Sequence, residues 1–284
     1  MNFFKVSFSI CLQNLRKWSK DYRIWSIFAL LFIVIQIYVD DIKKLSLYLD
    51  CDIPVWIFPF MYLQYYTKVL FTVPIILLFC NAPFIDQNQL YIYIRSGRKK
   101  WLTGQILYII AASFIYYLFI LVISILSTSI YGGFSMEWGK CLFTLAETNI
   151  AIAHNCPFVD ISSLIVDYFT PLQAVGFTFL VSWLNAVLIG MTIFTCNYLT
   201  NIKYLGISIS AFMIVFSWFV LNTGLPVLVH YSPTSWITLD NIDIGGKTTN
   251  PGFSYCITFY LICIILLISL SFLLSRKKGI DVRS

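Results

Sequence analysis

The stretch FSYCITFYLICIILLISLSFLL occupies residues 253–274 and carries no charged side chain, and the basic run SRKK follows it directly at residues 275–278. A helix needs about 20 predominantly apolar residues to cross the roughly 30 Å hydrocarbon core of a bilayer. This stretch is long enough, and nothing in it has to stay in contact with water. It therefore predicts a membrane-spanning helix that ends at a basic surface.

The rest of the chain has the same character as this stretch. Of its 284 residues 59% are hydrophobic and only 11% are charged, and the mean hydropathy is +0.82, whereas a soluble globular domain is about 25% charged. So few charges exclude a soluble enzyme and a disordered chain, and the net charge of +6 does not indicate nucleic-acid binding. We expect an all-α polytopic membrane protein, folded as one transmembrane domain over residues 1–284.

Six transmembrane helices are predicted in all. Their approximate bounds are Ile24–Val39, Val55–Cys80, Leu102–Tyr131, Tyr168–Leu199, Tyr204–Val229 and Phe253–Leu274. The first is short, and the fourth is longer than one crossing requires. Pro59 and Pro74 fall in the second, where the missing backbone donors predict kinks.

The distribution of Lys and Arg predicts how these helices are oriented, because cytoplasmic loops carry an excess of both residues. If both termini lie inside, the inner segments hold fourteen Lys and Arg residues and the outer segments hold four. Ten of the thirteen acidic residues then fall in the outer segments. We therefore expect a multi-pass protein of the cell membrane with both termini in the cytoplasm, and its basic inner face suits anionic membrane lipid rather than nucleic acid.

The segments outside the predicted spans divide into an N-terminal helix and large outer loops. Residues 1–20 mix apolar and basic side chains, which is typical of an amphipathic helix that lies at the inner membrane surface. The largest outer loops cover residues 132–167 and 230–252. Apolar periodicity in the first of them predicts short helices at Phe134–Asn149 and Phe158–Phe169.

Catalytic and metal-binding patterns are hard to find in this chain. The two histidines, His154 and His230, both fall in outer loops without convergent partners for a metal ion. Cys141 and Cys156 share one outer loop, where they can pair or stay free. The segment Asn241–Thr248 resembles the end of a phosphate-binding loop, but it lacks the leading glycine and a preceding strand, so we interpret it as a turn. We expect no catalytic residue, no metal and no cofactor bound by this chain.

Three polar residues in the spans are candidates for a translocation path. Lys68 is the one charged residue inside a predicted span, and Gln64 lies one turn to its outer side. Charge inside a membrane is costly and so indicates function, although a lysine near the end of a span can also extend its amine to the surface. Asn185 in the fourth span can line the path or bond between helices. Both interpretations stay open at this point.

Three stretches resemble the permeases, or membrane subunits, of the type-2 ABC exporter family. They are the inner loop FIDQNQLYIYIRSGRKKWLTGQ at residues 84–105, the stretch SPTSW at residues 232–236 and the basic tail SRKKGIDV at residues 275–282. In that family an acidic residue opens a short coupling helix between the second and third spans, and a basic turn with a glycine leads into the third. Asp86 stands where that family more usually has glutamate.

The resemblance implies that the loop between the second and third spans docks on a separate cytoplasmic ATPase. The residues expected to form this coupling element are Asp86, Leu90, Tyr91, Tyr93, Arg95, Arg98, Lys99 and Lys100. It also implies two copies of the ATPase, which bind ATP and Mg, and a second permease chain that completes the path as a homodimer or a heterodimer. The compact loops and the many aromatic residues favour a peptide or a lipophilic compound as the exported substrate.

Two other classes of protein fit the same sequence. The chain can be a membrane immunity or sensor protein that binds its ligand without transporting it. It can also be a membrane-bound enzyme that uses its few outer polar residues, such as His154 and His230. A partner ATPase distinguishes the exporter from both alternatives.

Overall fold

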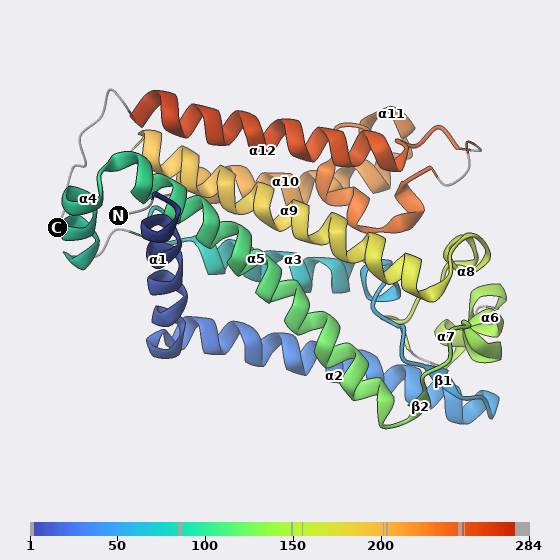
Figure 1. The fold of residues 1–284 in the computed structure, drawn as a ribbon. Coiled ribbons are helices and arrows are strands. Elements are labelled where there is room, and N and C mark those ends of the chain that lie inside the picture. Colours follow the sequence, from blue (N-terminus) through green and yellow to red (C-terminus); the bar gives the residue numbers. More distant parts are fainter. Residues whose placement is uncertain are drawn as a thin grey trace.

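The structure is a computed structural model, and it describes residues 3–84, 87–148, 150–154, 156–200, 202, 204–243, 246 and 248–275. The long helices are α2 (Tyr22–Leu49), α5 (Arg98–Ser129), α9 (Pro171–Thr200), α10 (Leu205–Thr223) and α12 (Phe253–Ser275). They run lengthwise through the molecule, with α5 inclined to the others (Figure 1). The described residues thus form a helical bundle.

Shorter elements fill the ends and the interior of this bundle. The helices are α1 (Phe3–Arg16), α3 (Tyr65–Phe79), α4 (Gln87–Ser96), α6 (Gly139–Glu147), α7 (Ile150–Ala153), α8 (Ser163–Tyr168) and α11 (Pro226–Val229), with 3-10 turns at Lys17–Lys20, Phe60–Tyr62, Pro233–Ile237 and Leu239–Asn241. The strands β1 (Ile53–Pro54) and β2 (Gly132–Gly133) pair in parallel, with Ile53 opposite Gly132. The predicted all-α fold is therefore confirmed for the residues that the structure describes.

Five of the six predicted spans are confirmed as helices long and apolar enough to cross a membrane, namely α2, α5, α9, α10 and α12. The second predicted span, Val55–Cys80, is wrong over its first part. Residues 55–64 form a loop with a short 3-10 turn, because Pro54 and Pro59 supply no backbone donor and restrict the residues before them. The helix that follows, α3, has 15 residues and is about 22 Å long, which is less than the roughly 30 Å of bilayer hydrocarbon.

The ends of two other spans also differ from the prediction. Helix α2 continues past Val39 to Leu49, and an ion pair of 2.8 Å between Lys44 and Asp41 lies on its surface one turn apart. Helix α10 ends at Thr223, because Gly224 takes a φ of 62° and the chain turns before the separate helix α11. The first span is therefore longer than predicted, and the fifth is shorter.

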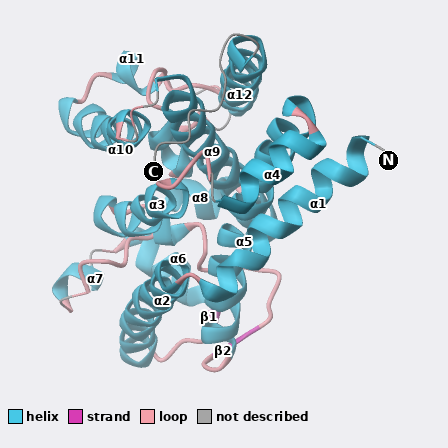
Figure 2. Cartoon of the chain, turned by 90° about the vertical axis from the view of Figure 1, so that its left-hand side faces the viewer, coloured by secondary structure: helices cyan, strands magenta, loops and turns pink. Residues whose placement is uncertain are grey.

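Helix α9 is the centre of the bundle. In its most apolar stretch 72% of the residues are buried, against 17% in α12, and α3, α5, α10 and α12 all pack on it. Seen end-on, α9 lies near the middle while α2, α10 and α12 lie at the periphery (Figure 2).

Two glycines permit the close packing of neighbouring helices on α9. A Cβ on Gly190 would lie 2.9 Å from the Phe79 ring of α3, and a Cβ on Gly206 of α10 would lie 2.6 Å from the Ile193 Cα of α9.

Helix α1 lies across one end of the bundle and packs on α5 (Figure 1). On its contact face Ile10 is buried, and the Asn14 amide donates to Gln105 Oε1 at 2.8 Å. Its other side leaves Phe4 78% exposed and Phe8 57% exposed. One face of α1 thus packs on protein while its other side exposes aromatic side chains, and a position at the membrane surface stays a prediction.

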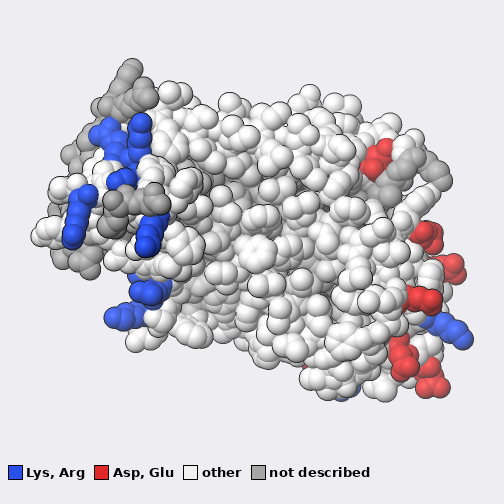
Figure 3. Space-filling model, in the orientation of Figure 1, with Lys and Arg blue, Asp and Glu red and all other residues white. Residues whose placement is uncertain are grey.

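Charged side chains gather at the two ends of the bundle (Figure 3). Lys and Arg lie at the end formed by α1, α4 and the start of α5, which we call the basic end. Asp and Glu lie at the opposite end, where a basic side chain is visible among them, and we call this the acidic end. The long surface between the two ends shows no charged side chain in this view. A charge-free band of this kind is what the hydrocarbon core of a bilayer requires.

The acidic end is covered by α6, α7 and α8 (Figure 1). The two short helices predicted in this outer loop are confirmed with narrower bounds as α6 and α8. The Trp138 Nε1 donates to the Phe169 carbonyl at 2.7 Å, and the Trp138 ring packs against Phe60 at 5.1 Å. Cys141 and Cys156 are both buried in this region, and both are free thiols.

Candidate functional site

The first candidate site is α4 together with the start of α5, at the basic end. Gly97 alone separates the two helices, and its φ of 82° lies in the region that favours glycine. The chain therefore turns sharply at this residue, and α4 packs back on α5. The short helix expected in this loop is thus present.

One face of α4 is tied to the bundle through Tyr93 and Arg98. The Arg98 Nε donates to the Tyr93 hydroxyl at 2.8 Å, and an Nη of Arg98 donates to the carbonyl of Ser275 at the end of α12. The Tyr93 ring packs edge-on against the buried Trp101 ring of α5 at 5.6 Å, and Trp101 lies 6.4 Å from the Phe194 ring of α9. A displacement of α4 would therefore be transmitted to α5, α9 and α12 through these contacts.

The other face of α4 is open to the surroundings. Tyr91 is 75% exposed, Ile94 is 78% exposed, and Arg95 beside them is exposed as well. An exposed apolar patch of this kind is a candidate contact surface for another protein or for the membrane. We call Tyr91, Ile94 and Arg95 the docking face.

Six of the eight residues predicted for the coupling element have described side chains, and they divide into exposed and partly buried ones. The exposed ones are Tyr91, Arg95 and Lys99, and the partly buried ones are Tyr93, Arg98 and Lys100. Asp86 lies outside the described residues, and so does the side chain of Leu90. Ile94 was missed by the sequence prediction. Its signal was its position three residues after Tyr91, which places both side chains on one face of a helix.

The second candidate site is a group of polar side chains inside the bundle. Lys68 of α3 is 1% exposed, and its Nζ has no hydrogen-bond partner in the described part of the chain. It lies 5.6 Å from the centroid of the Tyr65 ring, near the limit of a cation–π contact. The amine therefore ends inside the protein rather than at its surface, and burial of this polar group is not offset by a hydrogen bond.

Gln64 lies at the acidic end of α3, one turn before Lys68. Its backbone carbonyl accepts from the Lys68 N–H at 3.0 Å, while its side-chain Nε2 donates to Asp160 Oδ2 at 3.2 Å. Asp240 is near this contact. Burial raises the pKa of the Asp240 carboxyl, a hydrogen bond from Ser162 opposes the rise, and the charge of Asp160 adds to it. Gln64 thus connects α3 to the loop before α8.

Asn185 belongs to a polar stripe on α9. Thr178, Ser182 and Asn185 are spaced by four and three residues, which places them on one helix face, and all three are fully buried. The Asn185 Oδ1 accepts from the Thr234 hydroxyl at 3.4 Å, but its Nδ2 has no partner among the described residues. Asn185 therefore bonds to another element and still retains an unpaired donor.

Further buried polar groups of this kind lie beyond the three predicted path residues. Ser113 and Tyr117 lie one turn apart on α5, Tyr62 precedes α3, and the rings of Tyr62 and Tyr117 are 6.4 Å apart. We use the name polar set for seven residues of α3, α5, α9 and the turn before α3 whose buried polar atoms lack a partner in the described chain: Tyr62, Lys68, Ser113, Tyr117, Thr178, Ser182 and Asn185. Each unpaired group costs about 1–3 kcal/mol, so the set indicates a place for water or a polar ligand.

The two histidines occupy separate aromatic contacts. The His154 ring packs against Tyr48 at 3.9 Å, and the His230 ring packs against Tyr255 at 5.7 Å. In the part of the chain that the structure describes, no group of three or more His, Cys, Asp or Glu side chains could hold a metal ion.

The five long apolar helices and the charge-free band between the two ends define a multi-pass helical membrane protein. Comparison with models of known protein families, with curated proteins and with solved structures finds no match. What this membrane protein does must therefore be inferred from its own residues.

Proposed function

We propose that the chain is the transmembrane permease subunit of an ATP-driven exporter of the type-2 ABC kind. The observation that carries the proposal is the docking face of α4, which is exposed at the basic end. The opposite side of α4 is held to α5 by Tyr93 and Arg98, and those contacts continue to α9 and α12. A soluble protein bound to α4 would therefore move three spans at once.

In this proposal the energy comes from a separate cytoplasmic ATPase. Two copies of the ATPase bind ATP and Mg and serve two permease chains, which are either identical or related. This chain contributes the path and the docking face, and no catalytic residue or cofactor is assigned to it. The exported substrate is a peptide or a lipophilic compound.

The polar set supports a path through the same helices. A polar or partly polar substrate needs groups that can exchange hydrogen-bond partners while it passes through a membrane. The unpaired donors of Lys68 and Asn185 are such groups. Most of the polar set lies on α5 and α9, and these helices are also tied to α4 through Trp101 and Phe194. The proposed docking site and the proposed path therefore share two helices.

Purification of the tagged chain from its native membranes in a mild detergent tests this proposal. We expect a cytoplasmic protein with a nucleotide-binding sequence to co-purify. In vesicles, its ATP hydrolysis should respond to candidate peptides that are added to the complex. An immunity or sensor protein would bind a ligand with no ATPase attached, and that result would contradict the permease proposal.

The proposal includes an orientation, in which α4 faces the cytoplasm and α6 faces outward. The reason is the separation of basic and acidic ends, since Lys and Arg are retained on the cytoplasmic side. In a cysteine-free chain in intact cells, an impermeant maleimide should label Glu147→Cys at the acidic end and should not label Arg95→Cys on α4. Both positions are exposed in the chain itself, so both should react once the cells are opened and the chain is purified free of any partner. Labelling of residue 95 from outside would reverse the orientation.

Lys68→Met is expected to stabilise the protein while it impairs export. Methionine fills a similar space without the unpaired amine, so the free energy of unfolding should rise by roughly 1–3 kcal/mol. Loss of the only cation in the polar set should lower substrate-stimulated ATP hydrolysis. Thermal unfolding of the purified protein and hydrolysis in vesicles measure the two effects.

The matched control is Lys68→Arg, which keeps the positive charge at the same position. It should retain more export than Lys68→Met and gain no stability. If Lys68→Met exports as well as the wild-type chain, Lys68 has no role in the path.

A further inference from the structure

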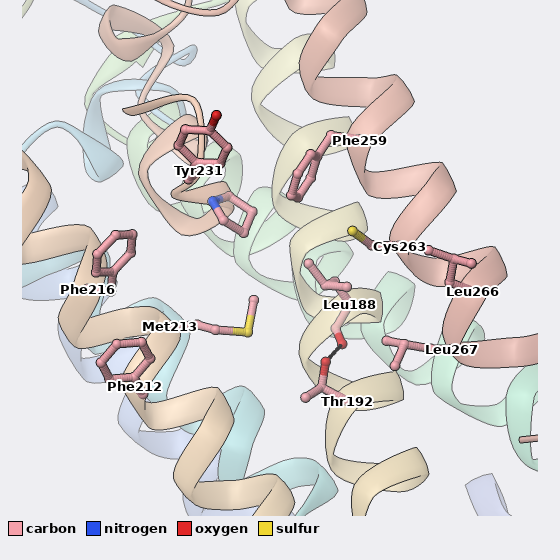
Figure 4. Close-up of a pocket in the computed structure, with 11 residues that line it drawn as sticks. Leu188, Thr192, Phe212, Met213, Phe216, Tyr231, Phe259, Cys263, Leu266 and Leu267 are labelled. Carbon is pink, nitrogen blue, oxygen red and sulfur yellow. Dashed lines mark hydrogen bonds between the residues drawn. The ribbon is translucent and has the colours of Figure 1, made fainter. Parts of the chain in front are cut away.

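A groove of about 450 Å³ lies between α9, α10 and α12 (Figure 4). Leu188 and Thr192 of α9 form its floor, while Met213 of α10 and Cys263 of α12 belong to its two walls. Tyr231 stands at one end of the groove. All three helices are candidate membrane spans, and Phe212 and Leu266 of the lining are 65% and 61% exposed, so in a membrane the groove would open toward lipid.

The lining of this groove is apolar. The Thr192 hydroxyl on the floor donates to the Leu188 carbonyl at 2.8 Å, so this hydrogen-bond donor is already satisfied within α9 (Figure 4). Met213 supplies a flexible side chain that can adapt to an occupant. A molecule that needs hydrogen bonds would lose them here, whereas a hydrocarbon chain would lose nothing.

The length of the groove and its depth within the membrane both correspond to one half of a bilayer. It extends along α12 from Phe259 to Leu267, which is about 12 Å at 1.5 Å per residue, and half of the hydrocarbon core is about 15 Å. Since α12 begins at Phe253 at the acidic end, the groove runs from near that end to the middle of the span. Tyr231 is 64% exposed with its hydroxyl directed out of the groove, as expected of an aromatic residue at the membrane–water interface (Figure 4).

We propose that this groove binds one acyl chain of a lipid from the leaflet at the acidic end, with the lipid headgroup beside Tyr231. The apolar lining, the length and the depth all match a single chain. Lipid tails are as apolar as the groove, so the hydrophobic effect does not favour either place for the acyl chain. Close packing against the lining would hold the chain instead. A chain between α10 and α12 would fix how far these two walls can approach. The inference does not depend on export and stands even if no ATPase partner exists.

Photolabelling in vesicles tests the proposal on the full chain. The probe is phosphatidylcholine with a diazirine in the middle of one acyl chain, diluted in unlabelled phosphatidylcholine, and mass spectrometry locates the adducts after irradiation. We expect adducts to concentrate on Met213, Cys263 and Leu267. The reference surface is the lipid-facing side of α2, where Phe32 is 46% exposed and Ile33 is 57% exposed. Equal labelling of α2 and of the groove would mean ordinary contact with bulk lipid and would overturn the proposal.

A matched pair of variants on α12 sharpens this test. Cys263→Trp fills the groove, whereas Ile262→Trp places the same side chain at a position that is 53% exposed and outside the groove lining. The first should reduce the groove adducts to the level of α2, and the second should leave them unchanged. If Cys263→Trp does not fold, Met213→Trp fills the groove from the other wall. Groove adducts that persist in a folded, filled variant contradict the proposal.

A second copy of this chain is the competing occupant, and a crosslink distinguishes it. A chain whose only cysteine is Cys263 should form no disulfide-linked dimer in vesicles under mild oxidation if lipid fills the groove. Efficient formation of a dimer through Cys263 would show that a second copy covers the groove, and the acyl-chain site would then be wrong.

Discussion

The double substitution Tyr91→Ala and Ile94→Ala is expected to release the ATPase from the permease. Both side chains are more than 70% exposed at the basic end, at 75% and 78%, and together they supply the apolar part of the docking face. A central interface residue costs about 2 kcal/mol when truncated, so the two substitutions together should raise the dissociation constant by roughly several hundredfold. Co-purification from membranes and substrate-stimulated ATP hydrolysis in vesicles measure the loss.

Every charge and every contact that holds α4 in place is kept in this double variant. Tyr93 and Arg98 still join α4 to α5 and α12, so the fold and the orientation should not change. The control is Phe134→Ala with Met136→Ala, which removes side chains that are 70% and 68% exposed next to α6 at the acidic end. The control should keep the ATPase. If the α4 variant also keeps it with normal hydrolysis, α4 is not the docking element.

Gly206→Ala is expected to weaken the packing of α10 on α9 severely. The added Cβ would lie 2.6 Å from the Cα and 2.7 Å from the carbonyl oxygen of Ile193, and these backbone atoms cannot rotate away. The Gly206 N–H also donates to Asn197 Oδ1 at 3.0 Å, and a shift of α10 would break this bond. Overpacking costs about 1–3 kcal/mol, so the melting temperature should fall by roughly 5–10 °C. A thermal unfolding curve in detergent measures the change.

The same methyl group added elsewhere in the bundle should have the opposite effect. Gly176 lies within α9, and a Cβ there meets nothing within 4 Å. Alanine is the better helix former by up to about 1 kcal/mol, so Gly176→Ala should unfold at the same temperature or a higher one. A Gly206→Ala protein that is as stable as Gly176→Ala would show that α9 and α10 do not pack as closely as described.

The coupling loop shows how far the sequence could define the candidate site. The resemblance of residues 84–105 to the permease family implied a short helix there, and α4 lies in that segment. The sequence could not show which face of α4 turns inward. That depends on the turn at Gly97 and on the position of Trp101, so Tyr93 was grouped with Tyr91 although it packs inside while Ile94 is exposed.

The second predicted span failed for a different reason. The sequence predicted that a membrane helix begins at Val55. In the structure Val55, Ile57 and Phe58 instead lie in a loop, fully buried inside the protein. Hydropathy reports only that a segment avoids water, and a protein interior satisfies this as well as a bilayer does. The prolines at 54 and 59 were the available signal that this run is not helical.

By itself the sequence determined the class of the molecule, the five long spans and the separation of a basic from an acidic end. A bilayer imposes these properties on each segment separately, so each can be recognised without knowledge of its neighbours. Only the tertiary structure decided which polar groups are unpaired, which side of α4 is open, and that α9, α10 and α12 enclose an apolar groove. Such properties depend on contacts between distant residues, for example Asn185 with Thr234 and Gly206 with Ile193, and no local pattern in the sequence reveals those contacts.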